Sequence, residues 1–280
     1  MTLLFGNAHV RINGYTRGKL GPMEEAVKSK LWLVGLIALT LGVSEGARAQ
    51  SEITLLSPNP IKETVDKLVA NFEAKSGTKV KITYGSGVGT RETVAKGGAL
   101  DATLLFAPFD DALKTGNVDK GSATVVARLR LAIAVKKGAP KPDISNLAAV
   151  KRTLINAKSI ISVDPAQGSV GGAVLLALDK MGLTDQIKSK IKWVPGGGEV
   201  QTSVAKGETE IAFGPYLSDM RNPGLDVVGA LPPEAATPVD ITGFISTNAK
   251  DRNAARALLT YLSSAEAAPE WRAAKAFPVR

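Results

Sequence analysis

Short β-rich runs alternate with helical ones from Gln50 to the end of the chain, and this alternation is what most limits the folds open to it. The runs 53–56, 80–84 and 102–107 are typical of strands, and apolar residues at helical spacing follow the first of them. The same order of strand, loop and helix returns over 159–213. This pattern predicts an α/β protein with largely parallel strands, built as two similar units.

Two further extended runs, 128–135 and 241–246, separate the units along the chain. We interpret them as two hinge crossings that join two α/β lobes. The lobe boundaries that follow are 50–127 plus 245–280 for the first lobe and 128–244 for the second. A last helix is expected over 253–262, with a buried stripe made by Ala254, Ala257, Leu258 and Tyr261.

The segment before the first strand has the features of a secretory signal. Lys28 and Lys30 precede the uncharged run 31–43, and Ala47-Arg48-Ala49 offers the small-x-small site that signal peptidase accepts. The apolar run is shorter than the roughly 20 residues that a spanning helix needs, although an uncleaved anchor is the alternative. Residues 1–49 are therefore predicted to be a signal peptide with a mis-called start, Met23 being the conventional start, and the protein is expected in the periplasm.

Composition excludes several kinds of chemistry. The single histidine, His9, lies in the predicted signal segment, and the chain has no cysteine. A chain without these residues cannot build Ser-His-Asp or Cys-His catalysis, disulfides or the usual zinc sites, so neither a metal nor another cofactor is expected. The formal net charge is +9, but the basic residues are scattered and lack aromatic interleaving. We therefore expect a monomer that does not bind nucleic acid.

Five loops, at 57–60, 85–90, 165–170, 196–198 and 214–216, follow predicted strands. Ligands of open α/β sheets bind outside the carboxyl ends of the strands, so these loops are expected to meet in a cleft. Four of them open helices, two of which are predicted to start at Arg91 and Glu199, and the free N–H groups of helix N-termini suit an anion. Tight turns alone are the alternative explanation for the glycines of any one loop.

Several short motifs carry a family resemblance. They are Ser57-x-x-x-Ile61, Tyr84-Gly-Ser-Gly, Gly97-Gly98-Ala99-Leu100-Asp101, Val163-Asp164-Pro165, Ile211-Ala212-Phe213-Gly214 and Tyr261-Leu262-Ser263-Ser264. In this order they resemble the molybdate-binding family of periplasmic substrate-binding proteins of ABC transporters, over nearly all of 51–280. The resemblance implies the type II periplasmic binding-protein fold, closure of two lobes on a small anion such as molybdate or tungstate, and delivery to an ABC permease in the inner membrane.

The resemblance also implies a set of site residues. Serine hydroxyls, backbone amides and a tyrosine hydroxyl hold the oxyanion in that family. Two of the corresponding positions are prolines here, Pro60 and Pro215, so a small organic anion is the alternative ligand. The residues expected to bind the ligand are Ser57, Asn59, Ser86, Gly87, Val88, Thr90, Val170, Gly197 and Tyr216.

Other readings of the same residues remain open. Arg91 or Lys96 could pair with a carboxylate, although each is also typical of a solvated helix face. The run 85–90 is superficially like a phosphate loop but lacks the Gly-Lys-Ser/Thr ending, and the acidic pair Asp110-Asp111 is typical of a helix start. An enzyme or a signalling adaptor on the same fold is therefore the alternative class, and no catalytic residue is predicted.

Overall fold

The computed structural model describes residues 51–217 and 222–279, which belong to one compact unit, Gln50–Arg280. The predicted signal peptide, 1–49, and Met23 lie outside the described residues. Within the described ranges, no helix has the length and apolar character needed to cross a membrane.

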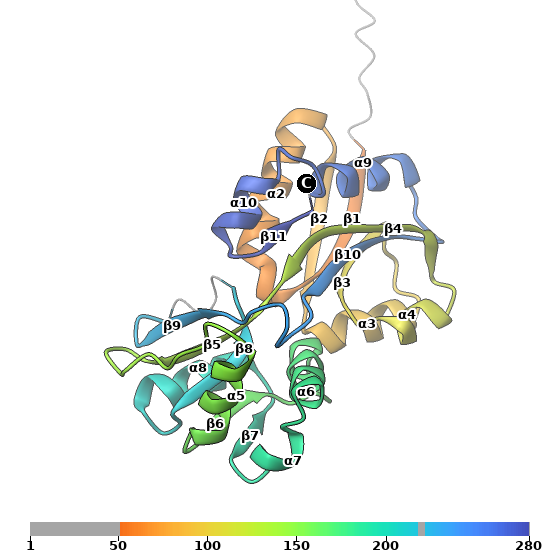
Figure 1. The fold of residues 1–280 in the computed structure, drawn as a ribbon. Helices are drawn as coiled ribbons and strands as arrows, with labels where there is room; N and C mark the ends of the chain where they lie inside the picture. The colour runs from red at the N-terminus through yellow and green to blue at the C-terminus, as the bar shows by residue number, and fades with distance from the viewer. Residues whose placement is uncertain (1–50, 218–221, 280) are drawn as a thin grey trace, which may run out of the picture. The chain divides into compact units, whose positions relative to one another are not determined.

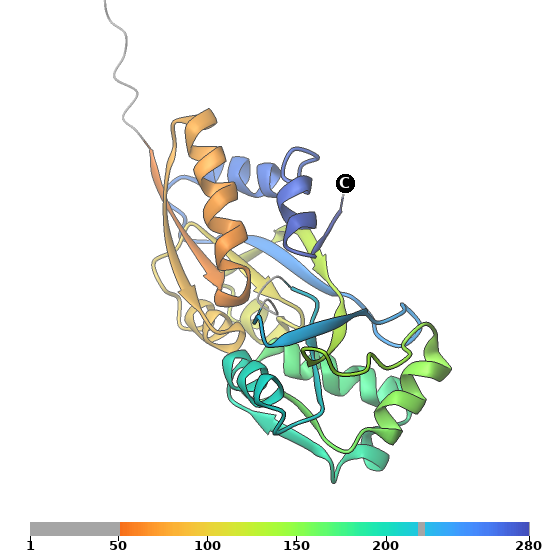
Figure 2. The ribbon, with the colours of Figure 1, turned by 90° about the vertical axis from the view of Figure 1, so that its left-hand side faces the viewer.

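The first lobe is built on a six-stranded sheet with the strand order β11-β4-β10-β3-β1-β2 (Figure 1). Its strands are β1 (Glu52–Pro58), β2 (Lys79–Gly85), β3 (Ala102–Phe106), β4 (Val118–Leu129), β10 (Val239–Ser246) and β11 (Phe277–Pro278). One face carries η1 (Asn59–Ile61), α2 (Lys62–Ser76), α9 (Arg252–Leu262) and α10 (Ala268–Ala273), and the other carries α3 (Gly87–Ala95) and α4 (Asp110–Lys114). Figure 2 shows α2 beside the two C-terminal helices.

The second lobe is built on a five-stranded sheet with the strand order β7-β6-β8-β5-β9. Its strands are β5 (Leu131–Lys136), β6 (Ile160–Val163), β7 (Ile191–Val194), β8 (Ile211–Pro215) and β9 (Leu225–Ala230). Helices α5 (Leu147–Asn156), α6 (Ser169–Met181) and α7 (Thr184–Ile187) cover one face, and α8 (Gly197–Lys206) covers the other. Each sheet therefore lies between two helical layers.

Strand direction is mixed. The strands β1, β2 and β3 are parallel to each other, and so are β6, β7 and β8. The strands β4, β10, β5 and β9 pair antiparallel. The expectation of largely parallel strands therefore holds for the part of each sheet that alternates with helices, because only a parallel pair needs a helical crossover.

The apolar pattern of α2 explains how the first core forms. Val65, Leu68, Val69 and Phe72 recur at helical spacing and are all buried against the sheet. On the sheet side they meet Ile53 and the neighbouring side chains of β1 that face the same way. Burying an aliphatic or aromatic side chain contributes about 1.5–3 kcal/mol, so these contacts are a main source of the lobe's stability.

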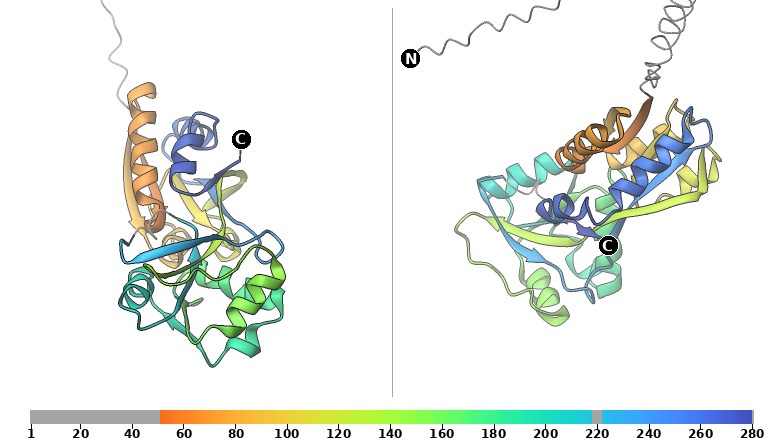
Figure 3. Two further views of the ribbon diagram at one scale, coloured as in Figure 1. Left: turned by 60° about the vertical axis from the view of Figure 1, so that its left-hand side comes forward. Right: turned by 90° about the horizontal axis from the view of Figure 1, so that it is seen from above.

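The chain passes between the sheets twice. It leaves the first sheet at Arg130, between β4 and β5, and it returns over 231–238, between β9 and β10. Figure 3 follows both passages, one in yellow-green and one in blue. The two run together, since the N–H of Leu231 donates to the carbonyl of Leu131 at 2.7 Å and the Arg130 guanidinium donates to the carbonyl of Leu231. The predicted crossing at 241–246 is a strand of the first sheet, so the structure places the return passage earlier in the chain.

The last long helix runs over the predicted range, but its fully buried residues differ in part from the expected stripe. The buried residues of α9 are Ala255, Leu258, Leu259 and Leu262. Ala254 and Tyr261 are partly buried and pack against the same core, whereas Ala257 is exposed, so the expected stripe was wrong at Ala257. Leu259 packs closely on β10, because a Cβ at Gly243 would lie 2.5 Å from the Leu259 side chain.

Candidate functional site

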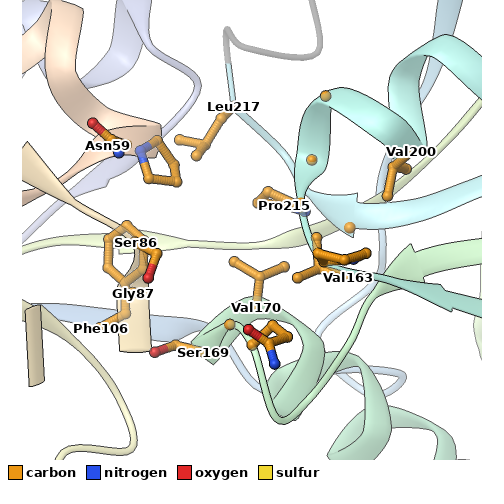
Figure 4. Close-up of a pocket in the computed structure, with 18 of the residues that line it drawn as sticks. Asn59, Ser86, Gly87, Phe106, Val163, Ser169, Val170, Val200, Pro215 and Leu217 are labelled. Atoms are coloured by element: carbon orange, nitrogen blue, oxygen red, sulfur yellow. The ribbon is translucent and has the colours of Figure 1, made fainter. Parts of the chain in front are cut away.

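A cavity of about 350 Å³ lies between the two lobes, at the carboxyl ends of the strands. Side chains of both lobes surround it in Figure 4. Its lining consists of Asn59, Pro60, Ser86, Gly87, Phe106, Val163, Gln167, Gly168, Ser169, Val170, Pro195, Gly196, Gly197, Gly198, Val200, Gln201, Phe213, Gly214, Pro215 and Leu217.

Helix α3 begins at the cavity, four residues before the predicted start at Arg91. Ser86 is its N-cap, in an extended conformation, and the Ser86 Oγ accepts a hydrogen bond from the N–H of Gly89 at 2.9 Å. The glycines of the predicted loop are thus the first turn of the helix. The N–H of Thr90 also has a partner, the Ser86 carbonyl, so the N–H groups of Gly87 and Val88 are the ones left at this N-terminus.

Helix α6 begins next to α3, on the opposite lobe. Its first residue, Ser169, is 3% exposed, and its Oγ has no hydrogen-bond partner. A Cβ at Gly87 would lie 3.1 Å from this Oγ and 3.3 Å from the Ser169 nitrogen. The two helix N-termini therefore approach each other so closely that only glycine fits at position 87 without displacing its neighbour.

The start of α6 is held tightly to the strand before it. A Cβ at Gly171 would lie 2.2 Å from the carbonyl oxygen of Val163, so position 171 requires glycine for close packing. The carbonyl of Gly168 accepts a hydrogen bond from the N–H of Gly172, at 3.3 Å. The N–H groups of Ser169, Val170 and Gly171 come before Gly172 in the chain, and they have no partner within the helix.

Helix α8 brings a third N-terminus to the cavity. It begins at Gly197 after the extended N-cap Gly196, two residues before the predicted start at Glu199. The carbonyl of Gly196 accepts from the N–H groups of Glu199 and Val200, at 3.2 and 3.4 Å. The N–H groups of Gly197 and Gly198 remain without a partner in the helix, and a Cβ at either glycine would meet open space.

The lining carries no charged side chain among the residues that the structure describes. Its hydrogen-bonding side chains are Asn59, Ser86, Gln167, Ser169 and Gln201, and the rest of the surface comes from glycine, proline and apolar residues. Three helix N-termini add free N–H groups and partial positive charge. Such a surface can hold an anion without a countercharge, and its apolar part can hold a hydrocarbon body.

One titratable cluster lies at the end of β2. The Tyr84 hydroxyl donates to Asp66 Oδ1 at 2.5 Å, and Lys62 Nζ lies 2.7 Å from Asp66 Oδ2. Burial raises the pKa of Tyr84, and the hydrogen bond and negative charge of Asp66 raise it further. Tyr84 stays a neutral donor, and its bond fixes the end of β2 to α2 two residues before Ser86.

The structure brings together five of the nine predicted site residues. Asn59, Ser86, Gly87, Val170 and Gly197 all line the cavity. The assignment of these residues to a ligand stays a prediction.

The other four predicted residues lie outside the lining. Ser57 is fully buried within β1, where its Oγ has no hydrogen-bond partner, and Val88 is half-buried in the first turn of α3. Thr90 is fully buried, and its hydroxyl donates to the carbonyl of Gly87 at 3.0 Å. Tyr216 packs against the apolar cluster beneath α8. None of these four residues lines the cavity, and their assignment to a ligand also stays a prediction.

The structure also shows where the two candidate basic residues and the two prolines lie. The Arg91 guanidinium donates to the carbonyl of Pro108 at 2.6 Å, and Lys96 lies on the exposed side of α3 near Glu92. Neither lines the cavity, which favours the solvated-face reading for both. Pro60 and Pro215 do line it.

Sequence reasoning missed three polar side chains of the lining, Gln167, Ser169 and Gln201. Ser169 was detectable in principle, because a serine after a glycine at the start of an apolar helical run is typical of a helix N-terminus. Gln201 follows from the helical spacing of α8 once its start is placed at Gly197. Gln167 lies in the loop 165–170 that was expected at the cleft, but nothing in the sequence singles out its side chain within that loop.

Comparison with known proteins identifies the family to which the chain belongs. The family described as bacterial extracellular solute-binding protein matches residues 53–274. An aconitate isomerase from Pseudomonas sp. is 31% identical over 229 residues, which cover 79% of this chain and 86% of that protein. The molybdate-binding protein ModA of Azotobacter vinelandii is 25% identical over 238 residues, covering 83% and 92%.

Solved structures share the fold. The sulfate-binding protein SubI of Mycobacterium tuberculosis superimposes with a TM-score of 0.67 at 18% identity, over 82% of this chain and 87% of that one. At this identity the likeness concerns the fold alone. Together with the two lobes and their layers, it confirms the predicted type II periplasmic binding-protein fold.

Proposed function

Because the chain belongs to the bacterial extracellular solute-binding protein family, we propose that it captures a small organic carboxylate in the cavity between its lobes. The observation that carries this proposal is the combination of three helix N-termini with a mainly apolar, uncharged lining. The helix N-termini supply donors to an anionic group, and the apolar residues supply contact to a carbon body.

An organic anion fits this lining better than molybdate or tungstate. A tetrahedral oxyanion offers oxygen on every side, so an apolar wall would leave some of its oxygens without donors. Pro60 and Pro215 occupy the positions where the molybdate-binding family is expected to offer hydroxyls, and proline offers neither a hydroxyl nor an N–H. The volume of about 350 Å³ equals that of roughly twelve water molecules at about 30 Å³ each, which also suits a molecule larger than a single oxyanion.

The route of the ligand follows from the family. We propose that the protein is exported through the signal peptide 1–49, acts as a monomer in the periplasm, and delivers its ligand to an ABC permease in the inner membrane. Closure would take place about the passages at Arg130 and 231–238, since hinges of such proteins lie in the few segments that join the lobes.

A thermal-shift screen of the purified protein tests the ligand class. The panel contains trans-aconitate, cis-aconitate, citrate, fumarate, molybdate, tungstate and sulfate. A ligand at 100 times its dissociation constant stabilises by about 2.7 kcal/mol, which is about 5–11 °C for a chain of this size. The proposal predicts the largest shifts with carboxylates; shifts with the oxyanions alone would contradict it.

The relative from Pseudomonas favours a second candidate, an isomerase acting on an aconitate. Moving a double bond by proton transfer requires a general acid or base near the carbon body. No lining residue in the described ranges has a side chain that titrates between pH 4 and 10, so the cavity supports binding better than proton transfer.

Proton NMR of trans-aconitate incubated with the purified protein separates the two candidates. Binding without catalysis predicts shifted or broadened signals and no appearance of the cis isomer above a protein-free control. Catalytic conversion at many turnovers per protein molecule would establish the isomerase in place of the simple binding protein.

A further inference from the structure

We infer that the ligand is an elongated dianion, with one carboxylate between α3 and α6, a second at α8, and an apolar body between them. The inference rests on the proposed function and names the class of carboxylate that the cavity selects.

The first end of the cavity is the contact between α3 and α6. Ser169 Oγ lies there, almost completely buried and without a partner, and Ser86 comes from the facing lobe. Figure 4 shows Ser86, Gly87 and Ser169 on the same side of the cavity. A buried hydroxyl without a partner costs free energy, and a carboxylate oxygen at this place would remove that cost.

The middle of the cavity is apolar. Val170 lies between the two ends in Figure 4, and Phe106, Phe213 and Leu217 also belong to the lining. None of these side chains can hydrogen-bond, so they suit the part of the ligand that carries no oxygen. A single charged group at either end would leave the opposite donors unused.

The second end is the N-terminus of α8. Val200, on the first turn of this helix, lies across the cavity from Ser86 and Ser169 in Figure 4. The N–H groups of Gly197 and Gly198 have no partner in the helix, and no side chain covers the two glycines. The nearby Glu199 is exposed and lies 3.6 Å from Lys192 Nζ, so its charge is partly compensated.

Matched ligands test the number of carboxylates. Fumarate and crotonate share one unsaturated four-carbon skeleton, and muconate and sorbate share one of six carbons; the first of each pair has two carboxylates and the second has one. Titration calorimetry of the purified protein is expected to show that the dicarboxylate of at least one pair binds roughly tenfold or more tightly than its partner.

Two variants test the two ends. Gly197→Pro removes one N–H at the first helical position, where proline fits, and the extended Gly196 before it suits a following proline. Gly197→Ala is the matched control, since it keeps the N–H and its Cβ meets open space. Ser169→Ala removes the hydroxyl at the other end. Thermal unfolding of all three variants checks that each is folded.

The dicarboxylate is expected to lose roughly tenfold or more in affinity in both Ser169→Ala and Gly197→Pro, and to keep its affinity in Gly197→Ala. A monocarboxylate can occupy only one end, so its affinity should fall in at most one variant. Equal affinity within both ligand pairs, or a Gly197→Pro variant that binds the dicarboxylate as wild type does, would overturn the two-ended site while the proposed function stands. If no carboxylate binds and molybdate does, the proposed function itself is wrong, and this inference with it.

Discussion

Replacing Ser169 by alanine is expected to change stability and binding in opposite directions. The Ser169 Oγ is buried at 3% exposure without a partner, and leaving such a group unsatisfied costs about 1–3 kcal/mol. Removing it should raise the free energy of unfolding of the ligand-free protein by about 1 kcal/mol, which corresponds to about 2–4 °C in Tm. A hydrogen bond to a charged ligand contributes about 1.5–3 kcal/mol, so the same change should weaken carboxylate binding by roughly tenfold or more.

Ser162→Ala is the matched control. Ser162 is also fully buried without a partner, but it lies in β6 and does not line the cavity. It should show the gain in stability and no change in affinity. Calorimetric unfolding without ligand and titration calorimetry with ligand measure the two effects. If Ser169→Ala binds as tightly as wild type, or if Ser162→Ala loses the same affinity, the reasoning about the cavity is refuted.

Three other expectations concern acid stability, closure and export. Burial alone would raise the pKa of Asp101, but hydrogen bonds from Thr54 and Lys250 outweigh it and hold the pKa below its usual range. The resulting stabilisation is present at neutral pH and is lost as pH falls below about 4, so Asp101→Asn should unfold more easily by about 1.5–3 kcal/mol at pH 7, with the difference narrowing between pH 4 and 2 in denaturant titrations. Solution scattering should show a smaller radius of gyration with saturating ligand, and an unchanged radius with ligand bound in calorimetry would argue against closure. Mass spectrometry of the periplasmic protein should find Gln50 at its N-terminus; a periplasmic form that retains Trp32 would contradict cleavage after Ala49.

The alternation of strands and helices was predictable because it depends on local periodicity. The sequence itself indicates that the strand 102–106 is buried, because the run is almost entirely apolar. It also indicates the buried side of α2, because the apolar residues of that helix recur at regular helical spacing. The stripe of α9 was not predictable in the same way. Ala254, Ala255 and Ala257 are equally small and apolar, so the choice among them depends on how Leu259 meets β10.

The site was predictable at the level of loops but not of every side chain. Glycine has low helix propensity, so Gly87 and Gly197 read as loop residues, yet a helix N-terminus tolerates glycine and both helices begin there. Ser57 stays within the sheet because β1 continues to Pro58. Tyr216 follows Pro215 at the end of β8, and successive residues of an extended chain face opposite sides, so it packs beneath α8 while Pro215 faces the cavity.

A crystal structure of the purified protein grown with equal concentrations of molybdate and of whichever dicarboxylate, fumarate or muconate, binds more tightly tests the central claim most directly. Anomalous scattering identifies molybdenum without regard to the shape of the electron density. We predict carboxylate density in the cavity, with an oxygen within about 2.5–3.2 Å of Ser169 Oγ and of the Val170 nitrogen, and no molybdenum peak there. A molybdenum peak between Ser86 and Ser169, with the carboxylate absent, would contradict the assignment of this cleft to an organic anion.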